Sequence, residues 1–290
     1  MDRSMPQADT LKLPGAEAAM LLHALADPRR DAIAASDVAV VVAHPDDETI
    51  GCGAQLARLH GRILVLVTDG APRNLVDAKR KGFASAQAYA AARRAELMGA
   101  LAIARVPAHA LRTLGVPDQE AALHLADLAR QLAQCFVQCR IRVVLTHSYE
   151  GGHPDHDATA FAVHAAAALV ATSGGQTSVI ETPFYRLGPE GILLQNFVSH
   201  PGGDAIEVPL TEEWRLLKQN MLAAHVTQEE VLRGFSRNVE RFRPAPNYDF
   251  SKLPNEGRLL YEAMPWGMTG ERWIEVAMAA LRALAAENGR

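Results

Sequence analysis

Two short segments of the 290-residue chain collect side chains that could bind a metal ion. Residues 43–48 read AHPDDE, and residues 147–157 read HSYEGGHPDHD. In the first segment, three neighbouring carboxylates would repel one another and partly protonate unless a cation lay between them. An imidazole beside carboxylates suits zinc better than calcium or magnesium, which prefer oxygen throughout. The first segment therefore indicates part of a zinc site.

The second segment supplies more imidazole groups. Gly151 and Gly152 permit a tight turn, and Pro154 suits the first position of a helix. His153 and His156 would then lie around the first helical turn. Two histidines and one aspartate form a three-ligand set that leaves a position for water, which is the pattern of catalytic zinc sites. Zinc lowers the pKa of such a water molecule to about 7.

Each segment also has an ordinary interpretation. A histidine that follows a strand is usually a loop residue that binds nothing. Asp46, Asp47 and Glu48 could simply cap a helix, because acidic side chains favour the helix N-terminus. Two such segments at the ends of separate strands favour the metal site over these interpretations.

Apolar runs predict the strands that precede both segments. Residues 38–43, 62–68 and 142–146 are apolar on both faces, as in parallel strands covered by helices on both sides. Helical patterns separate the runs, so the sequence predicts an α/β fold with a Rossmann-like, mostly parallel sheet layered by helices. Ligands bind at the carboxyl ends of such strands, so both segments are expected at one edge. A weaker strand is expected at 104–108 and a helix at 118–139.

The chain is expected to form a single domain over residues 1–290, since its length suits one large α/β domain. We expect an N-terminal arm and helix at 1–36 and a core at about 37–230. A loop-rich C-terminal cap is expected at about 174–290. Substrate specificity is expected to reside in this cap.

The composition argues against several classes of protein. The net charge is −4, lysine and arginine are scattered, and only 6% of residues are aromatic, which argues against a nucleic-acid-binding protein. Cys52, Cys135 and Cys139 are too few for a disulfide framework and indicate a reducing compartment. No stretch approaches the roughly 20 apolar residues of a membrane span, and no signal peptide is recognisable. We therefore expect a cytoplasmic protein.

The motifs AHPDDE at 43–48 and HPDH at 153–156 together resemble the PIG-L, or LmbE-like, family of N-acetylglucosaminyl deacetylases. The resemblance covers about residues 37–230. Further features agree with it, namely RRAE at 93–96, LGVPD at 114–118, and Lys218 followed by His225. It implies hydrolysis of the N-acetyl group of an N-acetylglucosamine-type sugar or glycoconjugate, with one Zn²⁺ per chain and with acetate and a free amine as products. The implied partner is a small amino-sugar substrate, and a homo-oligomer is left open.

The same resemblance implies roles for six residues. Three of them would bind zinc: His44, Asp47 and His156. Asp46 would be the general base that takes a proton from the attacking water. His153 would be charged and would donate to the oxygen of the tetrahedral intermediate or to the leaving amine, while Asp155 would orient His153.

Further residues are candidates for contacts with the substrate. Asp69 and Arg73 follow the second predicted strand, so they could bind sugar hydroxyls or simply cap the next segment. Arg94 could pair with a neighbouring carboxylate or with the substrate. His225 could reach the pocket from a distant helix.

Family members that act on sugar conjugates often carry a tyrosine close before the HPDH motif. Here Gly151 lies two positions before His153, and Tyr149 is the nearest candidate. His147 ends its predicted strand, where it could contact a metal ligand or have only a structural role.

Other functions stay open on the sequence alone. Another single-zinc amidase could act on a non-sugar amide. A phosphoesterase usually holds two metals about 3.5–4 Å apart, whereas the sequence offers ligands for one. Residues 51–53, Gly-Cys-Gly, superficially resemble the phosphate loop of a nucleotide-binding module. They lack a third glycine, however, and they follow acidic residues that would repel phosphate.

Overall fold

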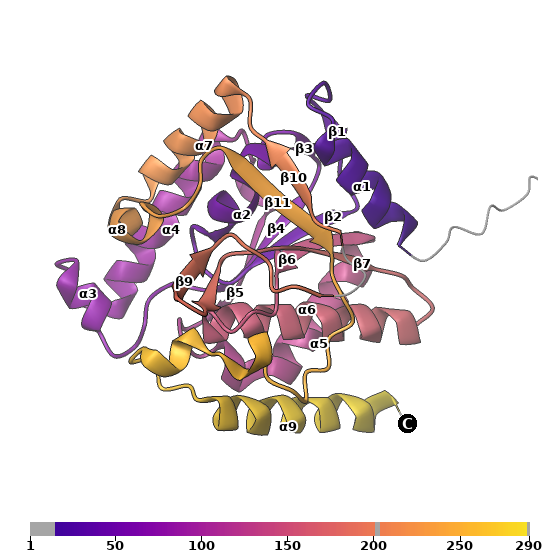
Figure 1. Cartoon of the computed structure of the whole chain (residues 1–290), viewed down its shortest axis with the longest axis vertical. Helices are drawn as coiled ribbons and strands as arrows, with labels where there is room; N and C mark the ends of the chain where they lie inside the picture. Colours follow the sequence, from indigo (N-terminus) through magenta and orange to yellow (C-terminus); the bar gives the residue numbers. More distant parts are fainter. Residues whose placement is uncertain (1–14, 201–203, 289–290) are drawn as a thin grey trace, which may run out of the picture.

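The computed structural model describes residues 15–200 and 204–288, and in this part of the chain seven strands form one central sheet. Its strand order is β10-β11-β7-β6-β2-β4-β5 (Figure 1). In chain order the strands are β2 (Val38–Val42), β4 (Ile63–Thr68), β5 (Leu111–Val116), β6 (Val143–His147), β7 (Ser178–Thr182), β10 (Ile206–Pro209) and β11 (Val239–Pro244). The expected α/β fold with a mostly parallel sheet is confirmed.

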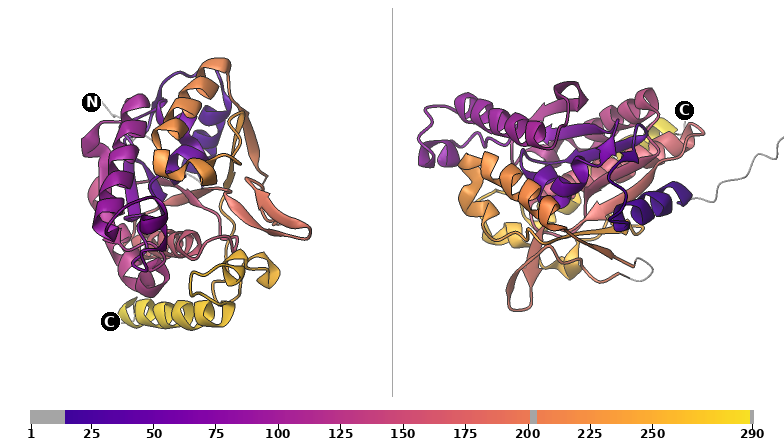
Figure 2. Two further views of the ribbon diagram at one scale, coloured as in Figure 1. Left: turned by 90° about the vertical axis from the view of Figure 1, so that its left-hand side faces the viewer. Right: turned by 90° about the horizontal axis from the view of Figure 1, so that it is seen from above.

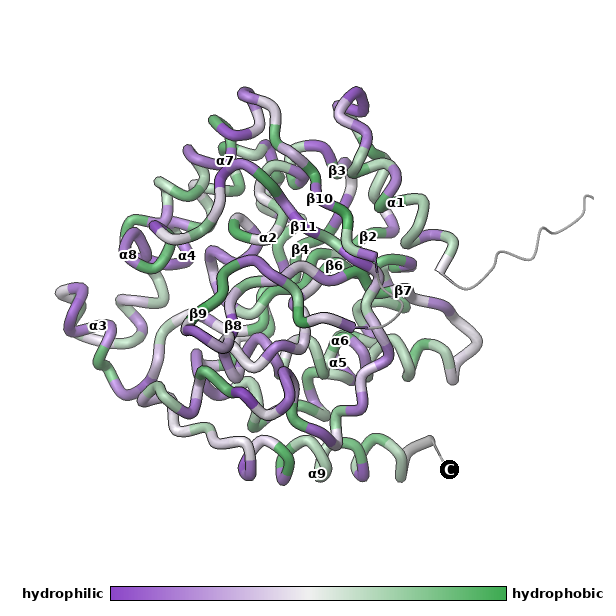
Figure 3. Tube along the Cα trace, viewed as in Figure 1, coloured by the Kyte–Doolittle hydropathy of each residue, from purple (hydrophilic) through white to green (hydrophobic). Residues whose placement is uncertain are grey.

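The five strands from β7 to β5 pair in parallel, and β11 and β10 add an antiparallel edge. All five residues of β2 are buried, because this strand pairs with β4 on one side and with β6 on the other. A strand buried on both faces needs apolar side chains at every position, which explains its unbroken Val-Ala-Val-Val-Val run (Figure 3).

Helices cover the two faces of the sheet and divide the core into two halves. Val40 of β2 packs in one half with α1 (Ala16–Ala26), α2 (Asp47–Leu56), α4 (Ala86–Ile103) and α7 (Glu212–Ala224). Val41 points to the opposite half, which is built with α5 (Leu125–Cys139), α6 (Pro154–Thr172) and α9 (Gly270–Asn288). Successive side chains of a strand point to opposite faces of the sheet, so neighbouring valines pack against different helix layers (Figures 1 and 2).

The remaining elements are short. Strands β1 (Ile33–Ala34) and β3 (Leu59–His60) form a small parallel pair, and β8 (Tyr185–Gly188) with β9 (Gly191–Leu194) forms an antiparallel hairpin that projects from the body (Figure 2). Helices α3 (Val76–Arg80) and α8 (Glu229–Leu232) have one turn or little more. The 3-10 turns are η1 (Ala108–Ala110), η2 (Ala121–His124), η3 (Val226–Gln228), η4 (Asn255–Gly257) and η5 (Leu260–Ala263).

Two expected elements differ from those observed. The strand expected at 104–108 is wrong, because α4 continues to Ile103 and is followed by a turn and η1. The strand of this region is β5, which begins at Leu111. The helix expected from residue 118 begins only with η2, because the backbone N–H groups of Gln119 and Ala121 donate to the Asp155 carboxylate and hold this stretch in a turn.

The order of the strands creates a crevice at one edge of the sheet. From β2 the chain proceeds outward through β4 and β5 on one side, and β6 and β7 lie on the other side. Ligand sites of open α/β sheets form where the strand order reverses in this way. Both metal-ligand segments follow the two strands at this point, β2 and β6. Within the described residues, no helix combines the length and apolarity needed to cross a bilayer.

We predict that Lys218→Met lowers the free energy of unfolding by about 3–5 kcal/mol, because it leaves a buried carboxylate without its counterion. The Lys218 ammonium donates to the Ile50 carbonyl at 2.8 Å and to Glu240 at 2.9 Å, and both charged side chains are fully buried. Urea unfolding followed by circular dichroism measures the change. Lys252→Met is the control, since it removes an exposed pair with Asp249 and should leave the midpoint almost unchanged. A similar midpoint for both variants would contradict the prediction.

Candidate metal centre and active-site pocket

Three predicted metal ligands meet in the crevice between β2 and β6. His44 follows β2, Asp47 begins α2, and His156 lies in the first turn of α6. The His44 Nδ1 and His156 Nε2 atoms are 3.2 Å apart. The Asp47 Oδ2 atom lies 3.2 Å from the first of these nitrogens and 3.4 Å from the second. All three side chains are buried.

This triangle has the size that one zinc ion requires. Zinc binds nitrogen and oxygen ligands at about 2.0–2.2 Å, so ligand atoms at the corners of a tetrahedron lie about 3.3–3.6 Å from one another. The observed separations are 3.2, 3.2 and 3.4 Å, so two lie just below this range and one lies within it. Two imidazole nitrogens and one carboxylate oxygen also match the chemistry of a catalytic zinc site. The residues present therefore fit the expected metal.

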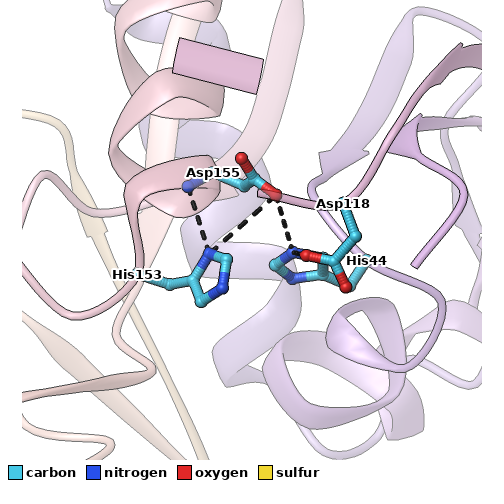
Figure 4. Close-up of side chains that lie close together, drawn as sticks. All are labelled: His44, Asp118, His153 and Asp155. Atoms are coloured by element: carbon cyan, nitrogen blue, oxygen red, sulfur yellow. Dashed lines mark hydrogen bonds and ion pairs between the residues drawn. The ribbon is translucent and has the colours of Figure 1, made fainter. Parts of the chain in front are cut away.

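Carboxylates orient the His44 ring from behind. Its Nε2 atom lies 3.1 Å from Asp155 Oδ2 and 3.3 Å from Asp118 Oδ1, on the side opposite to the Nδ1 atom (Figure 4). Its backbone N–H donates to Asp47 Oδ2 at 2.7 Å. A ring that donates from one nitrogen to a carboxylate presents the other nitrogen, unprotonated, to a metal.

The expected contact between Asp155 and His153 is made through the backbone. The Asp155 N–H donates to His153 Nδ1 at 3.1 Å, whereas the Asp155 carboxylate lies 4.0 Å from that atom and pairs with His44 (Figure 4). Burial, together with the neighbouring His44, lowers the pKa of His153 well below its usual value, although Asp118 opposes the shift. This favours a neutral ring over the charged one that the resemblance implies. With Nδ1 as the acceptor, its Nε2 atom carries the hydrogen.

Asp46 lies beside the triangle in a strained conformation. Its φ of 145° is one that L-residues rarely adopt, and the local contacts hold it there. The Asp46 N–H donates to Glu48 Oε2 at 3.0 Å, and Arg93 donates to Asp46 Oδ2 at 3.0 Å. Burial raises the pKa of Asp46 to about 7, despite the opposing charge of Arg93.

Arg93 joins the two loops that border the site. It donates to the carbonyl oxygens of Gly70 and Pro45 at 2.7 and 3.0 Å as well as to Asp46. Arg94 was the expected candidate for a substrate contact, but it lies on the exposed face of α4, outside the pocket. Adjacent helical residues point about 100° apart, so only one of the two arginines can face the site.

Comparison with known families identifies one domain in this chain. Residues 39–167 match the family described as PIG-L: GlcNAc-PI de-N-acetylase. These residues therefore form a PIG-L domain. The domain indicates an N-deacetylase, which is a hydrolase. No curated protein matches the chain in sequence.

Solved structures share the fold of this chain. The A40926 pseudoaglycone deacetylase Dbv21 is 20% identical, with a TM-score of 0.57, and the similarity covers 74% of this chain and 98% of that one. The zinc-inhibited form of the teicoplanin deacetylase Orf2 is 18% identical, with a TM-score of 0.54 and coverage of 73% and 98%. The N,N′-diacetylchitobiose deacetylase of Pyrococcus horikoshii is 20% identical, with a TM-score of 0.52 and coverage of 81% and 95%.

Three further candidates for substrate contacts lie outside the pocket. The Tyr149 hydroxyl donates to the Lys252 carbonyl and accepts from the Trp273 indole, within the core beneath α9. Arg73 donates to Asp69 at 2.6 Å, and both side chains also bond the turn at Ala71. The structure therefore gives these residues local partners.

Two buried histidines contact the segments that carry the predicted metal ligands. His225 lies 3.5 Å from Glu48 and 3.3 Å from Thr49, both in the first turn of α2. The His147 Nε2 atom accepts the Ala43 N–H at 2.9 Å, and the His147 ring stacks on His156 with 4.1 Å between centroids. Neither residue lines the pocket.

Three pocket residues were not chosen from the sequence as site residues: Asp118, Tyr185 and Trp266. The Tyr185 ring lies 5.2 Å from that of His156, and the Trp266 ring lies 4.3 Å from that of His153. A Cβ atom at Gly152 would lie 1.9 Å from the Tyr185 carbonyl, so only glycine lets the β8 strand approach this closely. The glycine pair was the one sequence signal for Tyr185.

We predict that Asp155→Asn weakens zinc binding by 10- to 100-fold, because the variant loses the carboxylate that orients His44. Competition with a chelating dye measures the affinity. Asp127→Asn serves as the control, since Asp127 is an exposed residue of α5, and this variant should bind zinc like the wild type. An unchanged affinity in Asp155→Asn would show that the carboxylate does not orient the ligand.

Proposed function

We propose that the protein hydrolyses the N-acetyl group of an N-acetylglucosamine-type sugar or glycoconjugate, and that it uses one zinc ion held by His44, Asp47 and His156. The observation that carries the proposal is the buried triangle of ligand atoms beside the Asp46 carboxylate. The family match supports the reaction. Three similar structures are named as deacetylases, one of them for N,N′-diacetylchitobiose.

A zinc ion at such a site acidifies water and polarises the carbonyl of the amide. Asp46 then takes the proton that the attacking water gives up. Arg93 bonds the Oδ2 atom of Asp46, so the proton goes to Oδ1. The bonds from Arg93 and to Glu48 fix the Asp46 carboxylate in place before the substrate arrives, which avoids a cost in reorganisation.

His153 also lines the cavity. Its Nδ1 atom accepts the Asp155 N–H, so its Nε2–H is free to donate a hydrogen bond to the oxygen that gains charge. The amine leaves with the proton that Asp46 took from the attacking water. Trp266 packs against the ring and keeps its orientation. This role needs a donor hydrogen but does not need a charged ring in the free enzyme.

Tyr185 supplies the tyrosine that the motif itself lacks. Its ring lines the pocket beside His156, close to the carboxylates of Asp46 and Asp47. Burial, with these carboxylates, raises the pKa of Tyr185 well above its usual value, so the phenol keeps its proton and can donate to the amide oxygen.

We predict that Asp46→Asn retains zinc but lowers kcat by about 10²–10⁴-fold, because general-base catalysis is lost. Acetate release from a panel of N-acetylated sugars gives the rate, and elemental analysis gives the metal content. N-acetylated amino acids in the same panel test an amidase that acts on non-sugar amides. Undiminished turnover of the sugars by Asp46→Asn would remove this residue as the base.

We predict that Tyr185→Phe lowers kcat by about 10- to 100-fold with little change in zinc affinity, because one hydrogen bond to the developing oxyanion is lost. Tyr149→Phe is the matched control. It should keep kcat but should unfold at a lower temperature, since it leaves the Trp273 indole N–H unpaired in the core. Equal rates for Tyr185→Phe and the wild type would exclude the phenol from the reaction.

A further inference from the structure

Four apolar side chains lie at the mouth of the catalytic cavity. The cavity holds about 430 Å³, and the metal-ligand triangle lies in its wall. Val76, Val231, Met264 and Trp266 also line it, and we call these four residues the apolar rim. The first three are 61%, 51% and 40% exposed, and Trp266 is half-buried.

Three segments that are far apart in sequence supply the apolar rim. Val76 begins α3, Val231 lies in α8, and the other two residues lie between η5 and α9. Figure 1 shows these segments around the left-hand part of the molecule. Isolated exposed apolar side chains are ordinary on protein surfaces. Here they converge on one cavity, and Trp266 also contacts His153.

Polarity in the cavity changes with depth. The metal ligands are buried, and polar Gln119 and Gln228 line the cavity together with the buried Asp118. The exposed part of the lining combines the apolar rim and Pro265 with polar Asn74, Asp77 and Arg80. Two charged residues at the mouth, Asp77 and Arg80, pair with each other at 3.2 Å, so they leave little net charge for a charged ligand.

We propose that the natural substrate is an amino sugar whose anomeric substituent is an uncharged apolar group, and that this group packs on the apolar rim. The inference rests on the proposed function for the placement of the sugar. With the acetamide at the metal ligands and the hydroxyls at the polar residues, the substituent is the part of the substrate that reaches the mouth. A cavity of 430 Å³ lies within the range of pockets that bury drug-sized molecules, about 300–1,000 Å³.

The test compares the methyl and hexyl β-glycosides of N-acetylglucosamine, both uncharged. Each buried methylene contributes about 0.8 kcal/mol, which is about fourfold in affinity. Two methylenes on the apolar rim should therefore make the hexyl glycoside at least tenfold tighter. Calorimetry with zinc-loaded Asp46→Asn protein gives the dissociation constants without turnover. Equal constants for the two glycosides would overturn the inference, as would tighter binding of the anionic N-acetylglucosamine 1-phosphate.

Variants locate the apolar contact. Val231→Ser and Met264→Ser should each reduce the preference for the hexyl glycoside at least threefold and leave the methyl glycoside unaffected. Val137→Ser is the matched control, because Val137 is 58% exposed on α5 and does not line the cavity. An unchanged preference in both rim variants would overturn the assignment of the contact.

A separate measurement tests the proposed function. Acetate release from the methyl glycoside by wild-type protein tests deacetylation, whereas the ratio of dissociation constants tests the apolar rim. A preference for the hexyl glycoside without acetate release would support the rim and contradict the reaction. Acetate release at equal affinity would support the reaction and overturn the rim.

Discussion

The structure depends on the convergence of two imidazole nitrogens and one carboxylate oxygen within 3.4 Å of one another. Such a group is unfavourable in a buried place unless positive charge compensates it. Burial alone would lower the pKa of His44, yet Asp118, Asp155 and Asp47 raise it well above its usual value. The surroundings thus favour positive charge at this position. The parallel pairing of β2 with β6 makes the convergence possible, because it places both ligand segments at one edge of the sheet.

A second set of contacts holds the ligand segments in place. Arg93 bonds two loop carbonyls and the Asp46 carboxylate, so it couples the loop after β2 to the loop after β4. Glu48 accepts the Asp46 N–H and lies beside His225. These buried charges compensate one another in pairs, which keeps the strained Asp46 backbone in a conformation that it would not adopt alone. The cost of the strain is offset by the bonds that the strain permits.

The C-terminal third of the chain does more than cover the pocket. Strand β11 pairs with β7 and carries Glu240, which meets Lys218 behind α2. Tyr185 at the start of β8 and Trp266 before α9 contact the histidines of the site. The same region therefore supports the ligand-bearing helix and forms part of the cavity wall. The predicted metal ligands thus come from the first 156 residues of the chain, whereas part of the cavity wall comes from residues after 174.

The sequence by itself determined the parts that depend on local pattern. Buried strands are visible as unbroken apolar runs. A ligand segment that directly follows a strand must lie at the carboxyl end of that strand. The parallel sheet, the edge that carries the site, and the proximity of His44, Asp47 and His156 could therefore be predicted. The last third was expected to be rich in loops, and β11 was not predicted there. Its partner β7 is about 60 residues away in sequence, so no local pattern indicates the pairing.

Only the tertiary structure decided which neighbouring side chain faces the site. Arg93 and Arg94 point to different sides of α4. The motif RRAE does not reveal which of the two sides faces the site. Tyr149 is closest to the motif in sequence but turns into the core, whereas Tyr185 reaches the cavity because Gly152 leaves room for its strand. The Asp155 carboxylate pairs with the distant His44, and only the Asp155 backbone N–H bonds His153. These outcomes depend on packing between distant segments, and packing energies are set by the whole fold and not by local order.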